Sequence, residues 1–375
     1  MASIKSPLEI TRELTRIDSM NPPGREHECA LYIGKMLQDA GLDVAYDQFG
    51  EGRTSVMARL AGSGGKAPIC FAGHIDTVPL GAKAWSKDPF AGEVADGKIY
   101  GRGTTDMKAG VAAYLWVALR LAQLPRGKAD ILFVSVAGEE TGCQGSIHVA
   151  QSKAVRGARA VVIAEPSSNY PIVGHRGALW LRAVATGVTV HGSMPHLGVN
   201  AIYKAARAIG KLQQFKFDAA PHPLLGGATL NVGTMQGGIN LNSVPDRAEF
   251  TIDIRTIPSQ DHKTLRGQIQ SYLGDDVTIT PVMDVGGVWS EAEDPWIREV
   301  FELMEPILGE KPVARGAPYF TDASALKPAF DGAPTLILGP GDMTLAHQTD
   351  EYCPVDKIEE AANVYETIAR RWSEM

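Results

Sequence analysis

The chain has 375 residues, of which 44% are hydrophobic and 21% are charged, values typical of a globular protein with about two domains. Its net charge of −7 argues against nucleic acid or an anionic membrane surface as a non-specific partner. No apolar run is long enough to cross a bilayer or to act as a secretory signal. The four cysteines have neither metal-finger nor disulfide-framework spacing, so we expect a reduced, cytoplasmic protein.

The first part of the chain predicts two helices followed by two strands. Ser6-Pro7 is a helix-start signal. A second helix is expected over Glu26–Ala40, because Gly41 can terminate it. Strands are expected at Leu42–Tyr46 and Thr54–Leu60.

Four later apolar runs, each bounded by turn residues, predict buried strands. They lie at Ile69–Ala72, Ile131–Val136, Val161–Ala164 and Thr335–Leu338, and helices are expected at Met107–Leu124 and after Pro354. Strands separated by helices are typical of the α/β class. We therefore expect a mostly parallel-sheet catalytic domain with helices on both faces.

Each of the four runs is followed by a loop that carries acidic or imidazole side chains. These side chains are His74 and Asp76, Glu139 and Glu140, Glu165, and His347. The carboxyl ends of parallel strands form one edge of a sheet, where sites are built, so we expect the four loops to converge. By chance, acidic and imidazole residues would scatter among helix faces and hairpins as well.

Another acidic residue, Asp106, opens the helix expected at Met107–Leu124. We expect Asp350 and Glu351 to be surface or supporting charges. Two histidines with several carboxylates and no cysteine suit a borderline divalent ion, zinc first and cobalt or manganese next. These carboxylates are too many for one tetrahedral zinc ion. Two ions about 3.5–4 Å apart, bridged by one carboxylate, would use all of them.

The segment 175-285 has a different pattern. Arg247–Arg255 alternates apolar and polar residues like a half-exposed strand, and Asn200–Gln213 has the spacing of an amphipathic helix. We expect an inserted α+β domain at 175-285. The metal-binding catalytic domain would then be made of 1-174 and 286-375.

Five motifs together resemble a known family of enzymes. They are GHIDTVP, the run from WSKDPF through DGKIYGRGTTDMKAG, GEETG, AEPS and AHQTDE. The sequence resembles the dinuclear-zinc deacylase and peptidase family, which includes acetylornithine deacetylase, succinyl-diaminopimelate desuccinylase, aminoacylase and glutamate carboxypeptidase. The resemblance extends from the first expected helix to the last. It implies that the inserted domain is ferredoxin-like and serves as a dimerisation or lid domain.

The resemblance implies a ligand set for two divalent metal ions. Asp106 would bridge the two ions. His74 and Glu165 would complete one site. Glu140 and His347 would complete the other.

The resemblance also implies the groups that act beside the metals. Asp76 would hold a ligand histidine through its other ring nitrogen, and Glu139 would be the general base. His191 of the HGSMPH motif would reach the active site of a partner subunit and stabilise the oxyanion, with His196 as the other candidate. The peptide bond after the bridging aspartate would be cis.

Substrate binding is expected from two residues of the insertion. An arginine at the end of an alternating strand can present a two-pronged donor to a carboxylate, and Arg255 ends such a strand. The resemblance implies substrate binding for Arg255 and Asn242. The alternative for Arg255 is a surface ion pair with Asp253 or Asp246.

We expect a metal-dependent amidohydrolase that removes the acyl group from an N-acyl-L-amino acid, of the acetylornithine deacetylase or succinyl-diaminopimelate desuccinylase type. In the family, glutamate at the position of Glu165 goes with deacylases and carboxypeptidases. A carboxypeptidase that releases glutamate from a short peptide is the alternative enzyme. A catalytically silent, metal-stabilised binding protein is the alternative of another class. The resemblance implies a homodimer, and the motifs leave the acyl group and the amino-acid side chain open.

Overall fold

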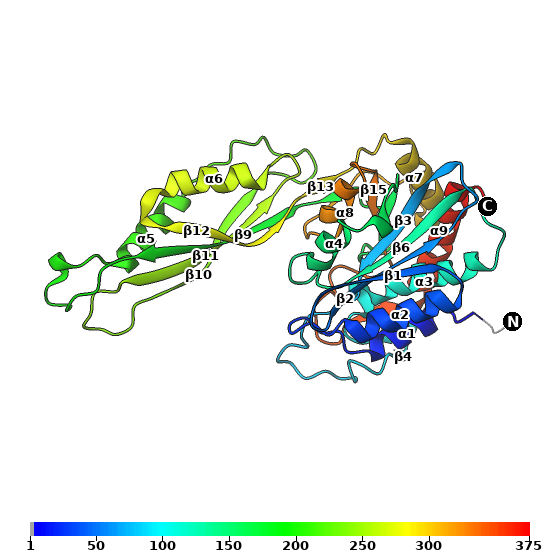
Figure 1. Ribbon diagram of the computed structural model, residues 1–375, viewed down its shortest axis with the longest axis horizontal. Coiled ribbons are helices and arrows are strands. Elements are labelled where there is room, and N and C mark those ends of the chain that lie inside the picture. The colour runs from blue at the N-terminus through cyan, green and yellow to red at the C-terminus, as the bar shows by residue number, and fades with distance from the viewer. Residues whose placement is uncertain (1–3) are drawn as a thin grey trace. The chain divides into compact units, whose positions relative to one another are not determined.

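The computed structural model describes residues 4–375 of the chain. The chain divides into two compact units (Figure 1). The first contains the chain up to Gly174 together with Trp289–Gly316 and Thr321–Met375, and the second contains His175–Val288 and Ala317–Phe320. In sequence, the second unit is therefore inserted into the first.

A six-stranded sheet forms the centre of the first unit. Its strand order is β1-β2-β6-β3-β7-β15, and the bounds in this order are Asp43–Gly50, Arg53–Leu60, Ala129–Val136, Lys66–His74, Val161–Ile163 and Thr335–Ile337. The four strands from β6 to β15 are parallel to one another. The other two, β1 and β2, run antiparallel to their neighbours.

The other elements of this unit are helices and short strands. The helices are α1 (Pro7–Arg16), α2 (His27–Asp39), η1 (Thr104–Lys108), α3 (Ala109–Ala122), α4 (Gln144–Val149), η2 (Lys153–Val155), α7 (Pro295–Leu308), α8 (Ala323–Ala329) and α9 (Val355–Ser373). One small sheet has the order β16-β5-β4, with bounds Tyr352–Pro354, Lys98–Tyr100 and Glu93–Ala95. Three two-residue strands, β13 (Val288–Trp289), β8 (Gly174–His175) and β14 (Gly316–Ala317), lie where the chain passes from one unit to the other.

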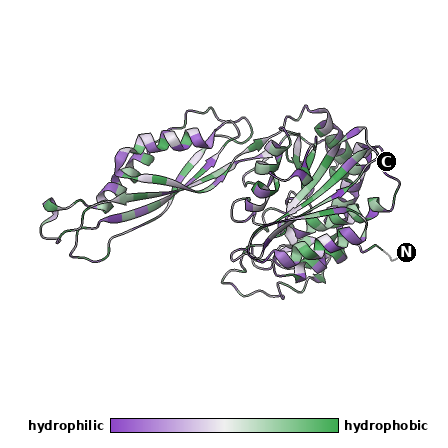
Figure 2. Cartoon of the chain, viewed as in Figure 1, coloured by the Kyte–Doolittle hydropathy of each residue, from purple (hydrophilic) through white to green (hydrophobic). Residues whose placement is uncertain are grey.

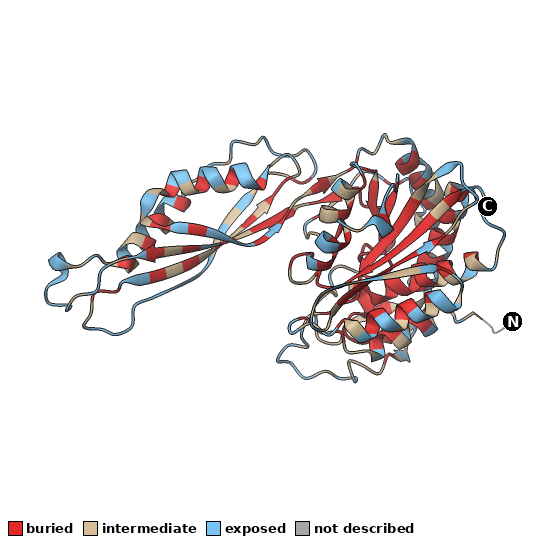
Figure 3. Cartoon of the chain, in the orientation of Figure 1, coloured by how far each residue is buried: buried red, intermediate tan, exposed pale blue. Residues whose placement is uncertain are grey.

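Alternate residues of the central strands pack on opposite faces of the large sheet, as the two-residue period of a strand requires. Phe71 of β3 and Phe133 of β6 belong to a hydrophobic cluster with Tyr114 of α3 and Tyr365 of α9. The short helix α4 contacts β1, β2, β6 and α8. Helices therefore cover both faces, and the central strands are buried along most of their length (Figure 3).

The second unit is built on a four-stranded antiparallel sheet with the order β10-β11-β9-β12. The bounds in this order are Thr229–Gly237, Arg247–Thr256, Gly177–Thr186 and Thr278–Val285, and the helices are η3 (Pro195–Leu197), α5 (Ala201–Leu212), α6 (His262–Leu273) and η4 (Gly274–Asp276). Apolar and polar residues alternate along β9 and β11 (Figure 2). The chain order β9-α5-β10-β11-α6-β12 is that of a ferredoxin-like fold.

The expected fold class, a mostly parallel α/β sheet with an α+β insertion, is confirmed. The helix expected from Met107 starts later, at Ala109, because Asp106 and Met107 have non-helical backbone angles. The helix start at Ser6 is confirmed by a capping box, in which Ser6 and Glu9 exchange side-chain to backbone hydrogen bonds. No helix within residues 4–375 is both long and apolar enough to span a membrane.

Candidate metal centre

Four loops at one edge of the large sheet carry the side chains of this site. The strand β3 ends at His74, and the loops that follow β6, β7 and β15 hold Glu139, Glu165 and His347. Because these four strands are parallel, their carboxyl ends lie at the same edge. As expected, the four loops therefore lie together at this edge of the sheet.

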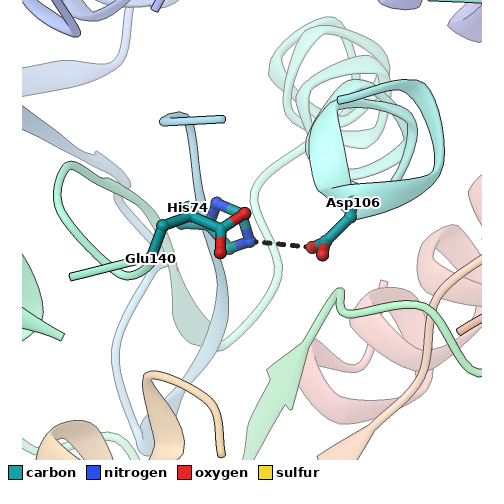
Figure 4. Close-up of side chains that lie close together, drawn as sticks. All are labelled: His74, Asp106 and Glu140. Atoms are coloured by element: carbon teal, nitrogen blue, oxygen red, sulfur yellow. Dashed lines mark hydrogen bonds and ion pairs between the residues drawn. The ribbon is translucent and has the colours of Figure 1, made fainter. Parts of the chain in front are cut away.

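The carboxylate of Asp106 lies between two histidine rings. Its Oδ1 atom is 3.0 Å from Nε2 of His74, a contact drawn in Figure 4. Its Oδ2 atom is 3.3 Å from Nε2 of His347. Each histidine also faces a second carboxylate. Oε1 of Glu165 is 3.8 Å from Nε2 of His74, and Oε2 of Glu140 is 3.0 Å from Nε2 of His347.

An irregular turn places Asp106 at this point. The residue lies in η1, where its φ of −125° and ψ of 90° depart from helical values just before α3 begins. The peptide bond between Asp106 and Met107 is cis, as expected. The thioether of Met107 accepts a hydrogen bond from the backbone N–H of His74 at 3.2 Å, so this turn contacts the end of β3 directly.

Asp76 makes more contacts than the sequence implied. Its backbone carbonyl oxygen is 3.0 Å from Nδ1 of His74, whereas its carboxylate Oδ1 is 3.5 Å from the same nitrogen. The carboxylate instead accepts the backbone N–H groups of Glu139 and Glu140, each at 3.1 Å. Asp76 therefore positions the loop after β6 as well as the histidine ring.

The acidic side chains of the cluster are buried and close to one another. Burial and the carboxylate of Glu165 raise the pKa of Glu139 well above its ordinary value. Burial and the carboxylate of Asp106 raise the pKa of Glu140 to about 7. Burial also raises the pKa of Glu165 well above its ordinary value, against the opposing effect of His74. These three carboxyl groups hold their protons more tightly than usual because they are buried and lie close to other carboxylates.

The histidines respond to the same excess of carboxylate. Burial alone would lower the pKa of His74, but Glu165 and Asp106 outweigh it and raise that pKa well above its ordinary value. Hydrogen bonds to Asp106 and Glu140 raise the pKa of His347 to about 10. The His347 side chain is 53% exposed, whereas the His74 side chain is 1% exposed.

This donor set fits two divalent cations. Two groups have ligand atoms that all lie within 4.8 Å of one another: His74, Asp106 and Glu140, and His74, Glu139 and Glu165. The two Asp106 oxygens point to different histidines, as a bridging carboxylate requires. Imidazole and carboxylate ligands without thiolate suit zinc, cobalt or manganese. Bound cations would also offset the charge excess that raises the carboxylate pKa values.

Two neighbours of the site gave no signal in the sequence. The side-chain amide of Asn21 donates to Oδ2 of Asp76 at 2.9 Å and to the Thr141 hydroxyl at 3.0 Å. The Cys143 thiol lies 3.9 Å from Oε1 of Glu139. The first contact joins segments that are 55 residues apart in the sequence, and the second joins residues four apart in the loop after β6.

Two further carboxylates are buried near the cluster. Asp322 immediately precedes α8 and is 0% exposed. Burial raises the pKa of Asp322 to about 6. Glu351, expected to be a surface or supporting charge, is 1% exposed and accepts the backbone N–H of Asp106 at 3.0 Å. Glu351 is therefore a supporting residue and not a surface one.

The other predicted site residues lie in the second unit. His191 is exposed and its Nδ1 lies 2.8 Å from the Ser193 hydroxyl. The backbone oxygen of Asn242 accepts the N–H of Gly192 at 2.7 Å, and His191 pairs with Ser243 in an isolated bridge. The structure therefore places His191 and Asn242 side by side.

Arg255 lies elsewhere in this unit. It forms an ion pair with Asp253, at 3.0 Å between Nε and Oδ1, and its guanidinium carbon is 5.9 Å from the centre of the Trp180 ring. The pairing with Asp253 is the alternative that the sequence left open. One third of the Arg255 side chain is exposed (33%), which leaves donors of its guanidinium accessible to solvent.

Comparisons with known proteins agree with this geometry. Residues 70–371 match the family described as peptidase family M20/M25/M40. An acetylornithine deacetylase from Salmonella arizonae is 33% identical over 308 residues, which covers 78% of this chain and 77% of that protein.

Solved structures share the fold over nearly the whole chain. The M20 family metallo-carboxypeptidase Sso-CP2 from Sulfolobus solfataricus has a TM-score of 0.81 at 17% identity, over 99% of this chain and 100% of that one. The YXEP protein of Bacillus subtilis, described as a dinuclear metal binding peptidase from the M20 family, has a TM-score of 0.73 at 16% identity, over 98% of both chains.

Proposed function

We propose that this chain, which belongs to peptidase family M20/M25/M40 and is a hydrolase that acts on amide bonds, removes the acyl group from N-acyl-L-amino acids. The observation that carries the proposal is the Asp106 carboxylate shared by two histidine–carboxylate pairs. A sequence relative that is 33% identical over 78% of the chain is an acetylornithine deacetylase. A reaction of that type, or the related removal of a succinyl group, is our first choice.

The proposed metal ligands follow the contacts in the cluster. Asp106 would be shared by two divalent ions, with His74 and Glu165 holding one of them and Glu140 and His347 the other. Support comes from the pairing of Glu165 with His74 and of Glu140 with His347. Zinc is the first choice for both ions, with cobalt or manganese as alternatives.

In the proposed mechanism, Glu139 moves the proton. Two divalent ions held by these residues would supply Lewis acidity that favours attack of a water on the acyl carbonyl. Glu139 accepts the proton of that water as it attacks, and then donates the proton to the leaving amine.

Asp76 and His191 have supporting roles in this proposal. Asp76 holds the backbone of Glu139 through its carboxylate and the ring of His74 through its carbonyl, which fixes the base relative to a ligand. His191 donates to the oxyanion that forms on the acyl oxygen. Arg255 and Asn242 bind the substrate, and the Arg255 guanidinium suits the free α-carboxylate of an N-acyl amino acid.

The positions of these residues support a homodimer. Asn242 precedes the Arg247 end of β11 and contacts the His191 loop, whereas Arg255 lies near the other end of the strand. At about 3.3 Å per residue, the span from Arg247 to Arg255 is roughly 26 Å. One small substrate cannot touch Arg255 and His191 of the same chain, so a second copy would have to supply one of them.

An exposed apolar surface on the second unit also supports the homodimer. Four large apolar side chains near the His191 loop and the edge strand β10 are mostly exposed: Leu197 at 62%, Tyr203 at 65%, Ile239 at 79% and Leu241 at 103%. Because soluble monomers rarely expose several such groups together, this surface is a suitable contact for a second copy. The edge of β10 has unpaired backbone groups that another strand can also use.

A substrate panel tests the proposed reaction. The purified chain, reconstituted with zinc or cobalt, is assayed for free amine from N-acetylornithine, N-succinyl-diaminopimelate and C-terminal glutamyl peptides. We expect release from the N-acyl amino acids. Release only from the peptides would replace the proposal with a carboxypeptidase. No release from any member, with two metal ions bound per chain, would favour a silent metal-stabilised binding protein.

A further inference from the structure

The carboxylate of Glu351 is saturated with hydrogen bonds. Oε1 accepts the backbone N–H groups of Thr105 at 2.8 Å and Asp106 at 3.0 Å. Oε2 accepts the backbone N–H of Gly103 at 3.0 Å and the Arg102 guanidinium at 2.6 Å. The side chain is 1% exposed. All four donors belong to the segment that leads to Asp106.

These backbone groups need an outside partner. The helix α3 begins only at Ala109, and the non-helical angles of Asp106 and Met107 interrupt the regular hydrogen bonding of the turn. Buried N–H groups without an acceptor would destabilise the turn. Glu351, which is distant in sequence, supplies the acceptor.

Arg102 connects the same segment to the His347 loop. Its side chain is 2% exposed, and it donates to the backbone carbonyls of His347 at 3.3 Å and Gln348 at 3.2 Å. It also donates to the carbonyl of Pro79 at 3.3 Å and lies over the Trp85 ring, 5.0 Å from its centre. The planar guanidinium can hold several acceptors in fixed directions at once, which an ammonium group cannot do.

We infer that Arg102 and Glu351 form a buried clamp that sets the position of Asp106 relative to His347. Glu351 holds the backbone N–H of Asp106, Arg102 holds the backbone carbonyl of His347, and the two charged groups bind each other at 2.6 Å. In the proposed metal centre, Asp106 would be the shared ligand and His347 a ligand of the second ion. The clamp rests on that proposed function, and Arg102 and Glu351 are positioning residues.

The burial of this pair favours a positioning role. Taking two opposite charges out of water is often no more stabilising than apolar packing. The pair sits between two ligand-bearing loops whose backbones it contacts on both sides. His347 itself is half-exposed and has a left-handed backbone, with φ of 64°. The loop that carries it therefore needs an external support to hold its ring at Asp106.

A cobalt titration tests the clamp. Metal-free wild-type and Glu351→Gln proteins are titrated with Co²⁺, followed by visible absorption and calorimetry. Glutamine keeps the size of the side chain but turns an N–H donor group toward two of the four donors. We expect the affinity for at least one Co²⁺ to fall roughly 10–100-fold, the range found for groups that orient metal ligands.

Lys327→Met is the matched control. The Lys327 ammonium also donates to backbone carbonyls of the first unit, those of Gly332 at 3.1 Å and Ala333 at 2.9 Å. Within residues 4–375, its hydrogen-bond partners are Ser290, Gly332 and Ala333, none of which is a proposed ligand. We expect its Co²⁺ affinity to stay within about threefold of wild type, since it orients no ligand. A comparable loss in the control would overturn the inference, because any buried cation would then have the same effect.

Arg102→Lys keeps the test decisive if the Glu351 variant fails to fold. Lysine preserves the positive charge but cannot hold Glu351 and the His347 carbonyl together. We expect weaker Co²⁺ binding and faster hydrogen exchange at the amides of Thr105 and Asp106 in the metal-free protein. Wild-type Co²⁺ affinity in every folded clamp variant would overturn the clamp.

The outcomes also separate the clamp from the proposed reaction. If the variants lose Co²⁺ affinity but the wild-type chain releases no amine from any N-acyl amino acid, the reaction fails and the clamp stands. If the wild-type chain hydrolyses these substrates and the variants bind Co²⁺ as tightly as it does, the clamp fails and the reaction stands. A wild-type chain that binds no Co²⁺ would overturn both.

Discussion

The carboxylate of Asp76 accepts the backbone N–H of Glu139 at 3.1 Å. This hydrogen bond joins the segment after β3 to the loop after β6, and so fixes the proposed base next to the end of the strand that carries His74. The second oxygen of Asp76 holds the N–H of Glu140 in the same way. One buried side chain thus positions the base and a ligand on neighbouring residues.

Asp76→Asn should reduce stability, metal affinity and turnover together. The backbone N–H groups of Glu139 and Glu140 each donate to one carboxylate oxygen of Asp76, but asparagine has only one side-chain oxygen. One buried N–H therefore loses its acceptor, which should lower the free energy of unfolding by about 1–3 kcal/mol. Metal affinity should fall roughly 10–100-fold. Urea unfolding, zinc titration and kcat on the best substrate of the panel measure the three effects. The matched control is Asp130→Asn, since Asp130 accepts the N–H of Gly62 at 2.7 Å elsewhere in this unit. An equal loss of zinc affinity in both variants would contradict the special role of Asp76.

Glu139→Gln should keep both metal ions and lose turnover. The amide cannot accept the proton of the attacking water, so kcat should fall by at least about 10²–10⁴-fold, the range of general acid–base catalysis. Metal content by atomic emission and kcat on the best substrate of the panel are the measurements. Glu140→Gln is the comparison, because loss of a proposed ligand should lower metal content as well. Activity near wild type in Glu139→Gln would show that another group is the base.

Mixing two inactive variants should restore activity if His191 acts on a partner's substrate. A His191→Ala chain keeps its own base, and a Glu139→Gln chain keeps its own His191. A mixed dimer therefore has one complete site, and a random mixture should reach about a quarter of wild-type activity for a twofold-symmetric dimer. The variants are mixed after reversible dissociation and assayed against each alone. Absence of any recovery, with mixed dimers demonstrated by mass spectrometry, would place His191 outside the partner's site.

The metal-free protein should lose stability as pH rises. Glu139, Glu165 and His74 have pKa values well above their ordinary ones, and those of Glu140 and His347 are about 7 and about 10. A group whose pKa is higher in the folded than in the unfolded protein stabilises the fold at pH values below its unfolded pKa, which is near 4.5 for Glu and 6.5 for His. This stabilisation is lost as the pH rises through the folded pKa.

Chelated and zinc-loaded protein should therefore diverge between pH 6 and pH 9. The Tm of the chelated protein should fall across this range, because the cluster loses the protons that offset its charge. The zinc-loaded protein should change less, because bound cations replace those protons. Differential scanning calorimetry at several pH values gives both curves. A chelated protein whose Tm rises from pH 6 to pH 9 would contradict the assigned pKa directions.

The sequence was sufficient to predict the strands and the loops that follow them. Ile69–Ala72 is apolar throughout and Ile131–Val136 is apolar except for Ser135, and such runs become central parallel strands when both faces are covered. Because His74 and Glu139 follow such strands directly, topology alone brings them to one edge. The identity of the metal and of the substrate depends on geometry that these patterns do not encode.

The supporting contacts could not be predicted, because their partners are backbone groups. Glu351 binds three backbone N–H groups, and no side-chain pattern signals such an acceptor. Asp76 was expected to hold a histidine, but its hydrogen bonds to the loop after β6 depend on how two segments fold together. The start of α3 at Ala109 was missed for a related reason: the turn around Asp106 follows the contacts of the site and not local helix propensity.

Every proposed metal ligand lies in the first unit, whereas Arg255, Asn242 and His191 belong to the insertion at His175–Val288. Under the proposed function, metal binding and substrate choice are encoded in separate stretches of one gene product. Mutations that accumulate in the insertion can then alter which acyl amino acid is accepted without disturbing the metal ligands. A chimaera that carries this stretch from a relative with another preference should inherit the relative's selectivity and retain this chain's affinity for zinc.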